Sequence, residues 1–144
     1  AGRIKGLGPN SWGMSACISP STGYSGAYGS YPIGAGYKLL EDGTVAPYGA
    51  LSFLPFTPKE SIDALNHMYQ IPGLVGEYGL YDAYSYVTKA NGDLPWIGKS
   101  YLGIDKGLVL LMFENYSTQL IWKLLHQNKS IQKGLKRLAF RKIQ

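Results

Sequence analysis

The sequence has little of what a metal site or a disulfide needs. Among its 144 residues there are one cysteine, Cys17, and two histidines, His67 and His126. An internal disulfide and a cysteine-based zinc site are therefore excluded. Because the two histidines stand far apart in the sequence, neither belongs to a closely spaced metal-binding pair. We expect no metal and no other cofactor.

Long hydrophobic runs are also missing. The longest apolar run covers residues 108–113, whereas a helix that spans a bilayer needs roughly 20 apolar residues. The first residues show no charged segment followed by an apolar one, which a secretory leader would have. The sequence thus predicts a soluble protein with no membrane span.

Acidic residues are absent after Glu114, and this absence explains most of the formal net charge of +5. Half of the 14 basic residues lie between Lys123 and Lys142. A nucleic-acid interface would interleave such residues with aromatic ones along one surface, and this sequence does not. A solvated, basic helix end is the favoured interpretation, with a phosphate-binding face as the alternative. We expect no nucleic-acid partner.

What the sequence has in quantity is apolar and aromatic residues. Its hydrophobic fraction of 45% and charged fraction of 16% are typical of a chain that buries a core. The length fits one domain or a piece of one, because domains usually have roughly 100 to 200 residues. The 12 tyrosines and 3 tryptophans combine apolar faces with polar groups, which favours a polar organic ligand.

The first part of the chain, residues 1–56, is dense in Gly, Tyr, Ser and Pro, as in Gly34-Ala35-Gly36-Tyr37. Closely spaced Gly and Pro residues of this kind predict that the segment is mostly loop. Long loops inside a compact domain commonly form lids or binding surfaces. A flexible linker is the alternative, but the many large aromatic residues speak against it.

The second part is predicted to be helical. Thr57-Pro58-Lys59-Glu60 matches a capping box with proline at the first helical position, which predicts a helix over residues 58–70. A shorter helix is expected over 47–53, and residues 75–91 are expected to be an aromatic-rich connection. A long buried helix, with a possible bend, is expected from Gly103 or Asp105 to His126. A last amphipathic helix is marked by Ile131, Leu135 and Leu138.

No strand-like alternation of comparable length is apparent, so the predicted fold class is all-α.

The candidate chemistry lies in four carboxylates outside the surface positions of these helices: Glu77, Asp82, Asp105 and Glu114. Hydrolysis of a glycosidic bond needs two carboxyl groups roughly 5 to 10 Å apart. On one continuous helix Asp105 and Glu114 would lie on opposite faces, ~13.5 Å apart along the axis, so they cannot form that pair.

Each carboxylate has two interpretations. Asp105 stands at a helix mouth and is either a cleft carboxylate or an ordinary N-cap. Glu114 follows an apolar run and is either buried with a partner or directed into a cavity. Glu77 and Asp82, which flank Tyr78 and Tyr81, either hold sugar hydroxyls or bind loop backbone.

Five stretches, in order, resemble the glycoamylase-like family of bacterial proteins, which includes endo-β-1,2-glucanases and a domain of cyclic β-1,2-glucan synthases. They are GPNSWGMSA at 8–16, DGTVAPYGA at 42–50, LPFTP at 54–58, GEYGLYDA at 76–83 and YLGIDKG at 101–107. A sixth, ENY at 114–116 leading into IWKL at 121–124, follows them. The ordered set covers nearly the whole chain.

The resemblance implies that residues 1–144 are the C-terminal portion of a single domain, with an (α/α)6 toroid that is incomplete here. The partners it implies are a glucan oligosaccharide or polysaccharide and the missing N-terminal portion of the same domain. It also implies carboxylate catalysis on a β-glucan, β-1,2-glucan above all, in the periplasm or outside the cell. By matching motif positions we assign Asp105 as the catalytic carboxylate or its close support. For sugar contacts we choose Trp12, Tyr48, Glu77, Tyr81 and Asp82.

Two positions depart from the family pattern. Cys17-Ile18 stands where a polar acidic position is usual, and Lys106 stands where an uncharged amide is usual. An ammonium beside Asp105 is expected to lower the pKa of that carboxyl. Two alternatives to a β-glucan hydrolase stay open: a non-catalytic remnant that binds carbohydrate or packs against another chain, and an α-glucan glucoamylase.

Overall fold

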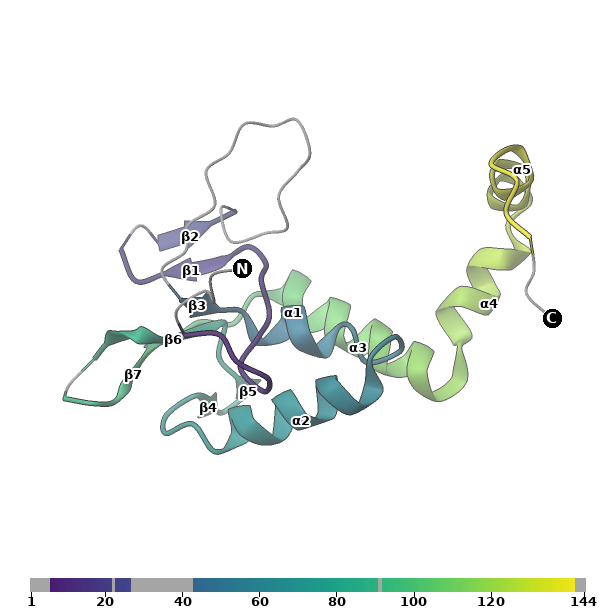
Figure 1. The fold of residues 1–144 in the computed structure, drawn as a ribbon. Helices are drawn as coiled ribbons and strands as arrows, with labels where there is room; N and C mark the ends of the chain where they lie inside the picture. Colours follow the sequence, from purple (N-terminus) through teal and green to yellow (C-terminus); the bar gives the residue numbers. More distant parts are fainter. Residues whose placement is uncertain (1–5, 22, 27–42, 91, 142–144) are drawn as a thin grey trace.

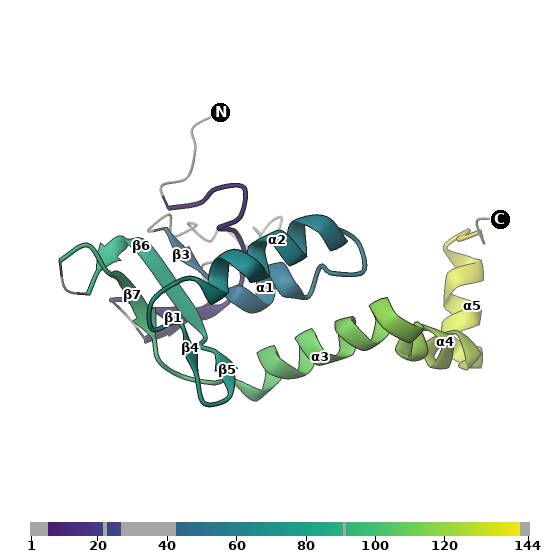
Figure 2. The ribbon, with the colours of Figure 1, turned by 90° about the horizontal axis from the view of Figure 1, so that it is seen from below.

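The computed structural model describes residues 6–21, 23–26, 43–90 and 92–141. Most of the Gly- and Tyr-rich stretch, including Gly34 to Tyr37, and Asp42 of the second matching stretch lie outside the described residues. Small sheets and two helices form a body, and the C-terminal helices lead away from it (Figures 1 and 2).

The all-α prediction, and with it the incomplete (α/α)6 toroid, is wrong. The described residues contain three small antiparallel sheets. One pairs β1 (Cys17–Ser19) with β2 (Gly23–Ser25), and a second pairs β4 (Val75–Gly76) with β5 (Gly79–Leu80). The third has the strand order β3-β6-β7, formed by β3 (Thr44–Val45), β6 (Ala83–Lys89) and β7 (Pro95–Gly98).

The longest of the strands that the sequence analysis overlooked is β6, which runs through the expected connection at 75–91. Its residues AYSYVTK are rich in aromatic and β-branched types, which favour a pleated, half-buried surface. Tyr84 pairs with both Val45 of β3 and Ile97 of β7. β6 is therefore the central strand of its sheet, although its partners β3 and β7 have only two and four residues.

The two helices of the body agree with the sequence. The expected helices over 47–53 and 58–70 are observed as α1 (Pro47–Leu51) and α2 (Pro58–Tyr69), each with proline in its first turn. The predicted capping box does not form, because the Thr57 side chain makes no cap hydrogen bond. Instead, the Thr57 hydroxyl donates to the Phe53 carbonyl at 3.4 Å.

The core lies between α1, α2 and the β3-β6-β7 sheet. Its largest fully buried side chain is Tyr84, whose hydroxyl lies 3.0 Å from Ser11 Oγ. Burial raises the pKa of Tyr84 to about 12. The hydrogen bond satisfies the one polar group that this ring brings inside. Around it pack Val45, Ala50, Leu51, Ala64, Met68, Ile71, Leu74 and Leu80.

The long C-terminal helix predicted from Gly103 or Asp105 to His126 is interrupted. It is observed as α3 (Gly103–Thr118) and α4 (Leu120–Gln127), joined at Gln119, whose φ of 60° is left-handed. The predicted bend is thus confirmed. The predicted burial is wrong, because much of the apolar surface faces outward, with Leu110 70% and Leu124 53% exposed.

The last predicted helix is confirmed as α5 (Lys129–Arg137), and the Asn128 side chain accepts hydrogen bonds from the Ser130 and Ile131 amides at its start. In both ribbon views α4 and α5 stand away from the sheets (Figures 1 and 2). Within the described ranges, no helix has the length and apolar character needed to cross a membrane.

Replacing Gln119 by glycine is expected to raise the free energy of unfolding by about 0.5 to 1 kcal/mol. The left-handed conformation costs a residue with a Cβ roughly 1 kcal/mol, and glycine adopts it without that cost. Urea unfolding followed by helical circular dichroism measures the change. The matched control is Gln127→Gly, at a helical position, which should lower stability. Stabilisation by both changes would contradict this account of the junction.

Candidate active site

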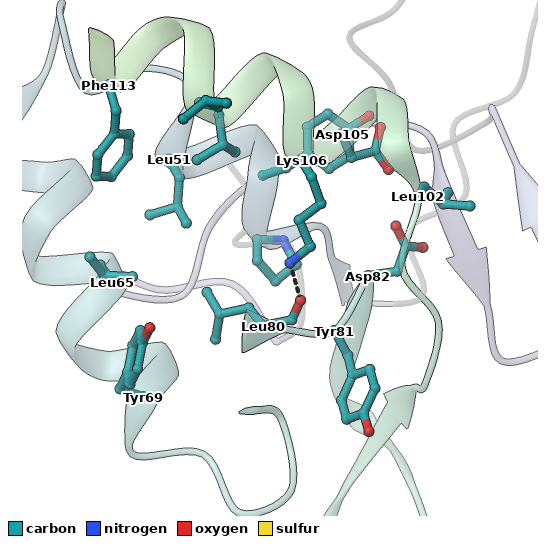
Figure 3. Close-up of a pocket in the computed structure, with 14 residues that line it drawn as sticks. Leu51, Leu65, Tyr69, Leu80, Tyr81, Asp82, Leu102, Asp105, Lys106 and Phe113 are labelled. Carbon is teal, nitrogen blue, oxygen red and sulfur yellow. Dashed lines mark hydrogen bonds between the residues drawn. The ribbon is translucent and has the colours of Figure 1, made fainter. Parts of the chain in front are cut away.

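A cavity of ≈320 Å³ opens between α1, α2, α3 and the end of β5. Figure 3 shows the side chains that line it. One side is apolar, formed by Leu51, Leu65, Leu80, Val109 and Phe113. The polar side is formed by Tyr48, Tyr81, Asp82, Asp105 and Lys106. An apolar cavity with a few convergent polar groups is the usual form of a small-ligand site.

Asp105 lies in the first turn of α3 and is only 6% exposed. It is not the N-cap of the helix, because that position is Leu102. Burial, together with the hydrogen bond and the charge of Asp82, raises the pKa of Asp105 to about 6. Lys106 acts in the expected direction and lowers it, but the larger effects outweigh this one. The expected effect of Lys106 is therefore confirmed in direction, although the net shift of the Asp105 pKa is upward.

Asp82 lies between β5 and β6 and is also 6% exposed. Its amide donates to the Ser100 carbonyl at 3.1 Å, which holds its backbone beside the segment that leads into α3. Its carboxyl oxygen Oδ2 accepts a hydrogen bond from the Ile18 amide at 2.7 Å. The chain at Cys17-Ile18, where the family pattern has an acidic position, thus contributes a backbone donor to the site.

Lys106 and a group of tyrosines form the outer part of the site. The Lys106 ammonium donates to the Leu80 carbonyl and lies 5.3 Å from the centre of the Tyr101 ring. Burial lowers the pKa of Lys106. Tyr101 stacks on Tyr81 with ring centres 4.9 Å apart. Gly76 lies close to both rings, and a Cβ there would require the Tyr101 and Tyr81 side chains to shift.

Tyr48 fixes the N-terminal segment to α1. Its hydroxyl lies 2.5 Å from Ser15 Oγ and 2.9 Å from the Ala16 carbonyl oxygen. Burial is the main cause of its raised pKa, and the Asp105 charge adds to it. The tyrosine therefore stands near the carboxyl groups as a neutral hydrogen-bonding group.

The structure brings together four of the six residues chosen from the sequence: Tyr48, Tyr81, Asp82 and Asp105 all line the cavity. Tyr81 and Asp82 point in opposite directions, as neighbours in an extended segment do, so the Tyr81 ring is directed away from the two carboxyl groups (Figure 3). Trp12 packs against the core, and Glu77 is exposed to solvent. Neither lines the cavity.

Glu114 is also outside the cavity lining. It is neither fully buried nor directed into a cavity, but half-buried, where it accepts a hydrogen bond from Thr118 Oγ1 at 2.5 Å.

Some residues around the site were missed by sequence reasoning. Tyr101 belongs to a matching stretch, and Gly76 marks the close approach that its ring requires. Partial burial raises the pKa of Tyr24 of β2, and the nearby charges of Asp105 and Asp82 raise it further. Nothing in the sequence signalled Tyr24, because the β1-β2 hairpin lies in the part that was expected to be loop.

The chain is similar to known proteins in sequence and in structure. The model of the Glycoamylase family, described as "Putative glucoamylase", matches residues 2–129. An exo β-1,2-glucooligosaccharide sophorohydrolase (non-reducing end) from Parabacteroides distasonis is 32% identical over 139 residues, which are 95% of this chain and 17% of the relative.

Two solved structures are similar as well. The endo-β-1,2-glucanase from Chitinophaga pinensis, in complex with sophorotriose and glucose, is 38% identical with a TM-score of 0.71. The match covers 93% of this chain and 29% of that one. A β-1,2-glucanase from Parabacteroides distasonis is 32% identical with a TM-score of 0.69, covering 92% and 17%. The chain therefore spans less than a third of the relatives' length, and it belongs to the Glycoamylase family.

Proposed function

We propose that this chain is the C-terminal portion of a glycoside hydrolase domain that cleaves β-glucan, with β-1,2-glucan as its substrate. The observation that carries the proposal is the meeting of Asp82 and Asp105, two buried carboxyl groups, in a cavity with an apolar wall. The names of the related β-1,2-glucan hydrolases support the choice of substrate.

Asp105 is proposed as the general base. Its pKa of about 6 leaves it ionised at neutral pH and makes it a stronger base than an ordinary aspartate, which suits activation of water. Asp82 is too close to be its acid partner. Inverting enzymes hold the two groups about 6.5 to 9.5 Å apart and retaining enzymes about 5 to 5.5 Å, whereas Asp82 is close enough to Asp105 to hydrogen-bond with its protonated form and so raise its pKa.

The general acid is therefore proposed to come from the part of the domain that this chain does not cover. That part would also cover the apolar face of α3 and α4, where Leu110, Leu111, Leu120, Leu124 and Leu125 are each at least 45% exposed. Apolar surface exposed over two helices commonly marks a site of contact with another segment or chain.

The sugar contacts proposed inside the cavity are Tyr48 and Tyr81. Tyrosine rings offer both an apolar face for a sugar ring and a hydroxyl for hydrogen bonds. Trp12 and Glu77 lie off the cavity, so we assign them to no sugar position there. Periplasmic or extracellular location stays part of the proposal, since the substrate is a polymer and the relatives are bacterial.

The test is hydrolysis by a completed enzyme. This chain would be joined to the part of the C. pinensis endo-β-1,2-glucanase that it does not cover, and incubated with β-1,2-, β-1,3- and α-1,4-glucans. Release of oligosaccharides from β-1,2-glucan is the expected result, with none from the 144-residue chain alone. Hydrolysis of α-1,4-glucan alone would favour the glucoamylase alternative. Binding of sophorotriose without hydrolysis would favour the non-catalytic one.

A further inference from the structure

The carboxyl groups of Asp82 and Asp105 face each other on the polar side of the cavity (Figure 3). Each side chain is only 6% exposed. One oxygen of each, Asp82 Oδ1 and Asp105 Oδ2, is buried and accepts no hydrogen bond from the described residues while both groups are ionised. Buried polar atoms without partners are uncommon in folded proteins and need an explanation.

A single proton bound to the pair would remove both the missing hydrogen bond and the repulsion between two buried charges. Two ionised carboxylates in contact repel each other and lose hydration, so one of a buried pair normally keeps its proton. That proton turns one oxygen into a donor toward the other group. It therefore gives the unpartnered oxygens a hydrogen bond and halves the buried charge.

The surroundings decide where the proton resides. Asp82 Oδ2 accepts the Ile18 amide at 2.7 Å, and a hydrogen bond from a backbone N–H favours the charged form of a carboxylate. The proton of the pair is therefore assigned to Asp105. This agrees with the pKa of Asp105, which burial and then the neighbouring Asp82 raise to about 6.

The other titratable groups around the pair do not donate a hydrogen bond to the two unpartnered oxygens. Lys106 of α3 lowers the pKa of Asp105, but its ammonium donates to the Leu80 carbonyl. Tyr48 of α1 and Tyr24 of β2 are near the carboxyl charges and have raised pKa values, so both rings stay neutral around pH 6. Cys17 of β1 lies near these tyrosines and carries no positive charge.

We propose that Asp82 and Asp105 share one proton, and that Asp82, held by the Ile18 amide, is a positioning residue that strengthens Asp105 as a base. Only the catalytic consequence rests on the proposed function. The shared proton itself is a property of the 144-residue chain and is tested without any substrate.

The proton couples stability to pH. Between the ordinary value of 3.8 and about 6, the folded chain keeps the Asp105 proton while the unfolded chain has lost it. This contribution to stability is therefore fully present below pH 3.8 and is lost as the pH rises through about 6. Most carboxylates, whose pKa is depressed by folding, behave in the opposite way.

The experiment is a ¹³C NMR titration of aspartate carboxyl groups in the full chain from pH 3 to 8. In the wild type we expect one proton to be released near pH 6. Asp105→Asn should abolish this step. Asp82→Asn should move it to lower pH, because the asparagine amide donates to ionised Asp105. Asp93→Asn, which changes an exposed carboxyl on the β6-β7 turn, should leave it in place.

Two results would overturn the inference. One is a wild type in which every aspartate titrates in the ordinary range, a result that needs no variant to fold. The other is an Asp82→Asn chain whose step stays near pH 6. In the completed enzyme, Asp82→Asn should also shift the acidic limb of the kcat/KM profile to lower pH. If the completed enzyme were inactive but the wild-type chain still released one proton near pH 6, the proposed function would be contradicted and the shared proton would not.

Discussion

Asp105→Asn is expected to lower kcat of the completed enzyme on β-1,2-glucan by about 10²- to 10⁴-fold, the usual contribution of a general base. Asparagine keeps the shape of the side chain but cannot accept the proton of the attacking water. KM should change much less, because the cavity walls and the tyrosines stay in place. Steady-state kinetics at pH 7 measure both quantities.

The same change should not destabilise the chain. At pH 7 Asp105 is ionised in the folded state despite its raised pKa, and the buried charge opposes folding. Removing it is expected to raise the free energy of unfolding by about 1 to 3 kcal/mol, since each pKa unit corresponds to about 1.4 kcal/mol and partial access to solvent reduces the total. Loss of activity together with a gain of stability separates a catalytic role from a structural one.

The matched control is Glu114→Gln, which neutralises a half-buried carboxyl that lies outside the cavity. Its kcat should stay within about twofold of the wild type, because a substitution outside the cavity and away from the reacting groups has a small effect. An Asp105→Asn enzyme with unchanged kcat would remove Asp105 from the mechanism, whatever the control does.

The sequence predicted best where one local signal decides the structure. Proline at the first helical position marked the start of α2, and the helical spacing of Ile131, Leu135 and Leu138 marked α5. Asp82 and Asp105 were both chosen from the sequence, 23 positions apart, and they line one cavity. Their contact itself could not be predicted, because it depends on how the segment before α3 folds back along Asp82.

Sequence reasoning failed where partners distant in the chain decide the structure. Strands β3, β4 and β5 have two residues each, too few to show an alternating pattern. β4 and β5 pair with each other locally, whereas the pairing of β3 comes from tertiary contacts such as Thr44 with Ser85. Trp12 illustrates the same limit for the site: its ring, predicted to contact sugar, packs against the core and does not line the cavity. An aromatic residue in a Gly-rich stretch serves either purpose, and only the fold distinguishes them.

Gly13→Ala is expected to destabilise the chain by about 3 kcal/mol or more, which is a large part of the usual total of about 5 to 15 kcal/mol. Gly13 has a φ of 135°, and a Cβ there would lie 2.3 Å from the Ala46 carbonyl oxygen and 3.1 Å from the Ala50 amide nitrogen. Both are backbone atoms, which no rotation of a side chain can move away. The clash and the strained backbone therefore add together.

The consequence should reach the site. Gly13 accepts a hydrogen bond from the Ala46 amide at 2.9 Å, and two residues later the same segment meets Tyr48 through Ser15. Displacing Gly13 should detach this segment from α1 and expose Trp12. Urea unfolding followed by tryptophan fluorescence would measure both the exposure of Trp12 and the loss of stability. Gly8→Ala is the control, because no atom lies within 4 Å of a Cβ at Gly8 and its φ is not in the left-handed range. Equal losses in both variants would show that the close approach of Gly13 to α1 does not hold the segment in place.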